Sequence, residues 1–155
     1  MSVQRGAEAV ARIAALPVSE ALVIGALRAR CEGPDQMALF ASELRQMAGA
    51  ERGLRLEESL DDFFALLLRH LRRPLMRHGM TCGCVGADEA VLAHLVSIAA
   101  SGDREDAMLM ACLLVRADVA PSVVHRACLL GLELMRAAPA PITTLPDRPG
   151  GATLH

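Results

Sequence analysis

Apolar side chains recur at steps of three and four residues along most of the chain, between short breaks that contain glycine or proline. Leu60, Phe64, Leu67 and Leu71 form one such series. This spacing gathers side chains on one face of an α-helix, because each turn contains 3.6 residues. The pattern therefore predicts an all-α fold, a single-domain bundle of six or seven helices.

The apolar residues are small or aliphatic rather than aromatic. Hydrophobic residues make up 53% of the 155 positions and aromatic residues 2%. Alanine and leucine are the strongest helix formers, and a chain of this length can bury a core without disulfides or a structural metal. We expect a helical domain over residues 1–138 and an extended or flexible Pro/Gly-rich tail over residues 139–155.

The breaks predict where helices begin and end. A first helix is expected over residues 3–15 and a second over residues 19–31, and a third begins near Asp35. Ser59 and Asp62 fit a capping box for a fourth helix. Pro74 should kink this helix or end it early, and Gly79 is otherwise its natural stop. A fifth helix begins at Asp88. The sixth, over residues 107–115, is apolar on all sides and is expected to be buried and central. A seventh covers residues 121–138.

Missing residue types exclude several functions. The chain has no lysine, tyrosine, tryptophan or asparagine, so lysine Schiff-base and P-loop chemistry are excluded. A net charge of -2 and only three phenylalanines argue against nucleic acid as a partner. The motifs of carboxylate di-iron proteins, zinc proteases, serine hydrolases and dinucleotide-binding enzymes are absent as well. We therefore expect a protein without catalytic activity.

Location and partners follow from the same composition. No apolar run approaches the roughly 20 residues of a membrane span, and the N-terminal segment lacks the apolar stretch of a signal peptide. The five cysteines are scattered and odd in number, which favours reduced thiols in the cytoplasm. We expect a cytoplasmic protein that makes no membrane contact and binds a protein partner or further copies of itself.

Residues 78–89, HGMTCGCVGADE, form the one stretch that helix packing does not explain. Gly83 allows a tight turn between Cys82 and Cys84, and His78 lies four residues before the first thiol. Thiolate and imidazole are the ligands that zinc prefers, so these three residues form a candidate zinc site. The candidates for a further ligand are His70, Cys31, Asp88 and His94.

The same segment allows two other interpretations. A disulfide between Cys82 and Cys84 would close a small strained ring, which is typical of a thiol-redox sensor. Alternatively, the segment is an ordinary turn with unreactive thiols. His94, which lies between apolar positions, is more typical of a core histidine than of a ligand.

A nearby arginine series has two interpretations as well. Arg69, Arg73 and Arg77 stand at four-residue steps and form a stripe that could bind anions. Cations at a helix C-terminus also complement the helix dipole without any ligand.

The leading functional hypothesis is a non-catalytic interaction or assembly protein. The abundance of apolar side chains with few aromatic rings leaves surface that a protein partner or a second copy could cover. Zinc binding and thiol-redox sensing, both at the Cys-Gly-Cys segment, are the two alternatives.

Overall fold

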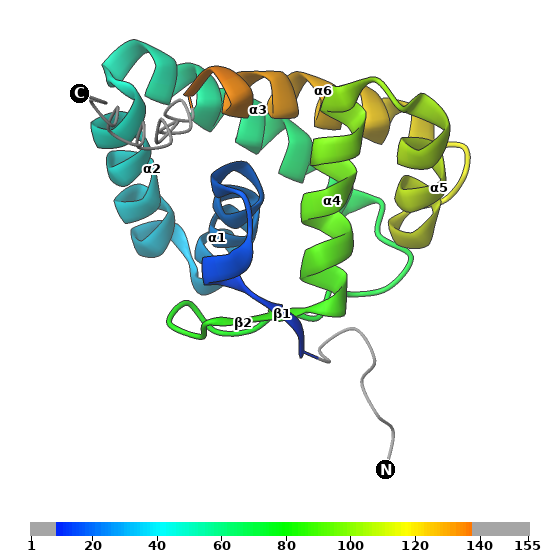
Figure 1. Cartoon of the computed structure of the whole chain (residues 1–155), viewed down its shortest axis with the longest axis horizontal. Coiled ribbons are helices and arrows are strands. Elements are labelled where there is room, and N and C mark those ends of the chain that lie inside the picture. The colour runs from blue at the N-terminus through cyan, green and yellow to red at the C-terminus, as the bar shows by residue number, and fades with distance from the viewer. Residues whose placement is uncertain (1–8, 138–155) are drawn as a thin grey trace, which may run out of the picture.

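The computed structural model describes residues 9–137, which form a mainly helical fold with one small sheet (Figure 1). In chain order the elements are β1 (Ala9–Arg12), a 3-10 turn (Ile13–Ala15), α1 (Val18–Glu32), α2 (Pro34–Ala48), α3 (Ala50–Arg69), β2 (Cys84–Gly86), α4 (Ala87–Ser101), α5 (Arg104–Leu114) and α6 (Ala120–Ala137). The prediction of a predominantly helical protein is confirmed. The predicted tail at 139–155 lies outside the described residues.

The core is formed where α4 and α6 cross and where α3 packs along α6 (Figure 1). Gly131 of α6 makes the close crossing possible, since a Cβ there would stand 2.5 Å from the Cβ of Ala100 and 2.8 Å from the carbonyl oxygen of Val96. Phe63 and Phe64 of α3 are fully buried and pack edge to face with their ring centroids 5.3 Å apart. Small residues and close helix contact thus replace large rings in most of the core.

The two strands correct the prediction of a helix over residues 3–15. Residues 9–12 pair antiparallel with β2, with Ala11 opposite Val85 and Arg12 opposite Cys84; residues 3–8 lie outside the described part. Val10 is 56% exposed, so a helix here would bury little apolar surface. Pairing as strands instead supplies hydrogen-bond partners to the backbone of the segment that carries the cysteines. The Ile13 N–H, which follows β1, also donates to the Gly83 carbonyl at 2.9 Å.

The start predicted for the fourth helix is wrong, and of the two ends considered the helix takes the early one, before Pro74, and not the one at Gly79. α3 begins at Ala50, directly after Gly49, whose φ of 87° ends α2 in a conformation that favours glycine. Ser59 and Asp62 are therefore interior residues and form no capping box. The helix stops at Arg69, one turn before Pro74, because the residues that precede a proline are restricted and the ring would clash with the helix. His78 consequently lies in a loop and not at a helix end.

The apolar helix that was expected to be central lies at the edge of the molecule (Figure 1). α5 packs on α4 and α6 through Ala107, Ala111 and Leu114. Its opposite face leaves Leu109 and Leu113 exposed to solvent. An all-apolar pattern does not distinguish a buried helix from one with an uncovered apolar face. Among the described residues, no helix combines the length and the apolar character needed to cross a membrane.

Candidate functional site

The loop between α3 and β2, residues 70–83, contains His78 and Cys82 and leads into Cys84 of β2. We call residues 70–84 the cysteine loop. The first residues of the cysteine loop are held by α5, since the Arg72 N–H donates to the Leu114 carbonyl at 2.9 Å. Near its end, Thr81 and Gly83 are exposed whereas Cys82 and Cys84 are half-buried. The carbonyls of Cys82 and Cys84 accept from one side, from Arg28, whereas the Gly83 carbonyl accepts from Ile13. This alternation indicates an extended backbone with both thiols on the same face.

A buried ion pair lies beneath the cysteine loop. Arg28 of α1 and Glu89 of α4 are 1% and 0% exposed. The Arg28 guanidinium makes two parallel hydrogen bonds to the carboxylate, from Nε to Oε1 at 2.7 Å and from Nη2 to Oε2 at 2.9 Å. Two buried charges are tolerated when they are paired and fully hydrogen-bonded, and the guanidinium fork matches a carboxylate in this way.

The remaining Arg28 donors bind the backbone of the cysteine loop. Nη1 donates to the carbonyls of Gly79 at 3.1 Å and Cys82 at 2.6 Å, and Nη2 donates to the carbonyl of Cys84 at 2.6 Å. A single side chain thus fixes both cysteine carbonyls and the turn before them. The polar loop needs such partners because its backbone passes over a helical core that offers few of them.

Glu89 holds the loop from the other side. Its carboxylate accepts hydrogen bonds from the backbone N–H groups of His78 at 3.2 Å and Gly86 at 2.9 Å, in addition to those from Arg28. The Gly86 contact closes the first turn of α4, which is the usual role of a glutamate at this position. His78, Gly79, Cys82, Cys84 and Gly86 are therefore all connected, directly or through Arg28, to one carboxylate.

Asp88, the residue before Glu89, anchors the preceding part of the loop. Its carboxylate receives two hydrogen bonds from Arg73, at 2.7 and 2.8 Å, and one from the Met76 N–H at 2.8 Å. Asp88 is 5% exposed and all of these bonds use its two oxygens. The residue proposed as a further zinc ligand is instead part of the support of the loop.

The ionisation of both carboxyl groups reflects these contacts. The hydrogen bonds from Arg73 hold the pKa of Asp88 below its ordinary value, against the opposing effect of burial and with help from the Met76 N–H. For Glu89, burial acts most strongly and would raise the pKa, but the hydrogen bonds from Arg28, Gly86 and His78 together keep it lowered. The pKa of Arg28 is raised mainly by its hydrogen bond to Glu89. All three groups are therefore charged at neutral pH.

The two functional side chains that come together on this support are His78 and Cys82. The Cys82 Sγ lies 3.7 Å from the His78 Nδ1, within the range of a hydrogen bond to sulfur. The structure holds all the described cysteines as free thiols, with Cys82 and Cys84 half-buried and Cys31 exposed. The arrangement can move a proton between a thiol and an imidazole, which is the first requirement for a reactive cysteine.

The other predicted ligands do not join this pair. His70 ends α3 at its C-terminus, and His94 is exposed on α4, with its Nδ1 3.9 Å from a Glu20 oxygen and not in the core. Within residues 9–137, no three histidine, cysteine or acidic side chains gather closely enough to hold a metal ion. Zinc binding by His78, Cys82 and Cys84 stays a prediction, and it would require these side chains to move closer together.

The arginine stripe predicted at residues 69, 73 and 77 does not form, since the helix ends at Arg69. Arg73 binds Asp88, and Arg77 binds Glu32 of α1 at 3.0 Å. Two of the three arginines therefore hold the cysteine loop in place and are not available to a ligand in this arrangement.

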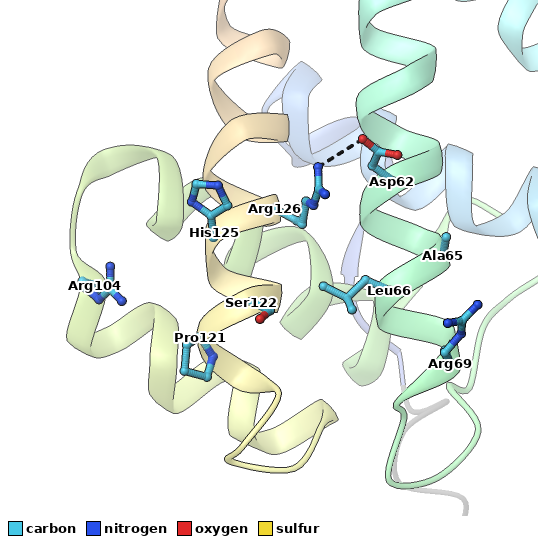
Figure 2. Close-up of a pocket in the computed structure, with 9 residues that line it drawn as sticks. All are labelled: Asp62, Ala65, Leu66, Arg69, Arg104, Pro121, Ser122, His125 and Arg126. Carbon is cyan, nitrogen blue, oxygen red and sulfur yellow. Dashed lines mark hydrogen bonds and ion pairs between the residues drawn. The ribbon is translucent and has the colours of Figure 1, made fainter.

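A second hollow lies between α3, α5 and α6 and has a volume of about 720 Å³. Asp62 and Arg126 point toward each other across it and form an ion pair at 3.1 Å, whereas Arg69 and Arg104 stand at opposite edges (Figure 2). The basic side chains of this hollow do not converge on one point, so they do not form a binding site for a small anion. The cysteine loop is therefore the stronger candidate site.

Sequence reasoning missed the residues that build the site. Arg28 is flanked by the fully buried Leu27 and Ala29, so a charge inside an apolar helix stripe was the available signal. Asp88 was predicted as the start of a helix and as a candidate zinc ligand. Both Asp88 and Glu89 lie in the first turn of α4, and their contacts with the loop were not predicted. No protein-family model, no curated protein and no solved structure matches the chain. Function must therefore be inferred from the site alone.

The lowered pKa values predict how stability depends on pH. A carboxyl whose pKa is lower in the folded state stabilises the fold above its unfolded pKa and loses that contribution as the pH falls through the folded value. Ordinary values of 3.8 and 4.5 apply to Asp88 and Glu89 when unfolded. We expect thermal unfolding between pH 3 and 7 to show a level melting temperature near neutrality and a steady fall below about pH 5.

An Asp88→Asn variant should be less stable at neutral pH and should show a shallower fall in acid. Glu51→Gln is the control, because this side chain is 89% exposed and should leave the acid profile unchanged. An Asp88→Asn profile with the same acid slope as the unmodified protein would contradict the assignment.

Proposed function

We propose that the protein is a thiol-redox sensor whose reactive residue is Cys82 and whose second thiol is Cys84. The contact between the Cys82 Sγ and the His78 Nδ1 at 3.7 Å carries the proposal. The buried ion pair of Arg28 and Glu89 beneath the loop supports the proposal. Two ionised groups are costly to bury, and here they hold the segment that presents the thiols. The half-buried positions of both cysteines allow a small oxidant to reach them.

The proposed reaction uses hydrogen peroxide as the oxidant. His78 accepts the proton of the Cys82 thiol, and the thiolate attacks one peroxide oxygen as the O–O bond breaks. The leaving hydroxide takes the proton back from His78, which gives a sulfenic acid and one water. The Cys84 thiol then attacks the Cys82 sulfur and releases the second water as the disulfide forms. Two thiols and one peroxide thus yield one disulfide and two waters, and a dithiol or glutathione reverses the change.

The extended backbone makes this disulfide strained. Residues two apart in a strand have Cα atoms about 6.6–6.8 Å apart, at the upper end of the roughly 4.4–6.8 Å that disulfides span. Gly83 between them carries no side chain. A Cβ placed there would have only the Arg12 guanidinium within 4 Å, at a distance of 3.8 Å. A strained disulfide is reduced easily, which suits a reversible sensor better than a structural bond.

We expect Cys82 to react with hydrogen peroxide at least about tenfold faster than Cys31, although Cys31 is the more exposed thiol. Mass spectrometry of the 82–84 peptide should show a loss of two daltons that a dithiol reverses. A Cys84→Ser variant should accumulate the sulfenic acid on Cys82. His78→Gln should slow the reaction of Cys82, whereas His94→Gln, on the exposed side of α4, should not.

Two results would contradict the sensor. Equal reactivity of Cys31 and Cys82 would show that the loop does not activate its thiol. A Cys82 rate that is unchanged in His78→Gln would show that the imidazole takes no part in the reaction.

Zinc binding is the second candidate, because the His78–Cys82 contact and the shared face of Cys82 and Cys84 put three donors of the right kind along one short loop. Elemental analysis of protein purified without chelator tests it. Zinc near one equivalent that is lost in a Cys82→Ser/Cys84→Ser variant supports binding at the loop. Less than about a tenth of an equivalent, even after incubation with zinc, would contradict it.

The predicted role as an interaction or assembly protein depends on a different surface, the exposed face of α5. It is compatible with a sensor, since α5 also holds the start of the cysteine loop through the bond from the Arg72 N–H to the Leu114 carbonyl.

A further inference from the structure

We propose that α5 pairs antiparallel with α5 of a second copy and forms a two-fold symmetric dimer. The exposed face of α5 carries Leu109 and Leu113, which are 68% and 61% exposed. They are four residues apart and therefore adjacent on one side of the helix. The other large apolar side chains that are more than half exposed, Val10, Leu39 and Met135, stand singly on different elements, and isolated exposure of this kind is common.

A hollow beside these leucines can receive a partner side chain. It has a volume of about 450 Å³ and is lined by Met108, Leu109 and Cys112 together with Arg104 and Glu105. In an antiparallel pair with its axis near residue 111, Leu113 of one copy stands opposite Leu109 of the other and faces this hollow. One surface thus supplies both the projecting side chain and the recess, as a two-fold symmetric interface requires.

Charges at the two ends of α5 select the antiparallel orientation. Asp103, Glu105 and Asp106 surround its start, where Arg104 is the one cation of that turn. Arg116 and Asp118 follow its end and pair with each other at 3.2 Å. The Arg72 guanidinium donates to the Cys112 carbonyl there at 3.1 Å, so these three residues leave one net positive charge at this end. Antiparallel pairing brings the acidic start of one helix to the arginines at the end of the other. Parallel pairing would place the acidic starts of the two helices side by side, where their like charges would repel each other.

The size of the contact predicts its strength. An α-helix of 11 residues is about 16 Å long, so pairing through α5 alone gives an interface at the small end of the range for specific complexes. We therefore expect a reversible dimer with a dissociation constant in the micromolar range and not a permanent one.

Sedimentation analysis over a concentration series, in a reducing buffer that prevents intermolecular disulfides, tests the dimer. The unmodified protein should shift from monomer to dimer as its concentration rises. Leu109→Glu and Leu113→Glu should each remain monomeric, because each would bury an unpaired carboxylate against the opposing leucine of the second copy. Leu39→Glu on α2 is the matched control, since Leu39 is 59% exposed and should leave the equilibrium unchanged.

Charge reversal tests the orientation. Glu105→Arg and Arg116→Glu should each weaken the dimer by about tenfold or more, and the double variant should recover most of the loss. These substitutions spare the fold, because Glu105 is exposed and Arg116, at 78% exposure, pairs with the exposed Asp118. A monomer at all concentrations, or a double variant that dimerises no better than the single ones, would overturn the proposal. Neither result depends on the chemistry of Cys82.

Discussion

The ion pair between Arg28 and Glu89 is the interaction on which the rest of the cysteine loop depends. Both side chains are buried, and they connect α1, α4 and a loop that comes between α3 and β2 in the sequence. Burying two charges stabilises a fold little compared with apolar packing, but removing one partner leaves an unpaired charge and costs about 3–5 kcal/mol. The pair therefore specifies one conformation of the loop, whatever its net contribution to stability.

The start of α4 divides this task between adjacent carboxylates. Asp88 holds the first half of the loop through Arg73 and the Met76 N–H, whereas Glu89 holds the second half through Arg28 and the His78 N–H. The side chains of consecutive residues in the first turn of a helix point in different directions. Two neighbouring carboxylates can therefore accept hydrogen bonds from two different parts of the loop. The irregular loop is thereby attached to α4, a helix that packs against α1, α5 and α6. A thiol and an imidazole held in this way keep their relative position without a metal or a disulfide.

Sequence patterns predicted the helices well because each helix has an apolar face with the helical period and a glycine or proline near its ends. They failed where long-range contacts override local preference. Residues 9–12 form a strand because β2 lies beside them, and α5 is peripheral although its sequence is apolar on every side. The candidate thiols and His78 were identified from their spacing. Arg28 was not, because pairing across 61 residues leaves no local pattern beyond one charge among buried neighbours.

Amide hydrogen exchange in an Arg28→Met variant tests most directly whether Arg28 builds the site. Circular dichroism should show that the helices persist, while the amides of residues 76–86 should exchange at least about tenfold faster, because three loop carbonyls lose their donor. An Arg28→Met/Glu89→Met double variant should regain stability, since no buried charge remains unpaired, and its loop should stay unprotected. Protection of residues 76–86 equal to that of the unmodified protein, in either variant, would contradict the account.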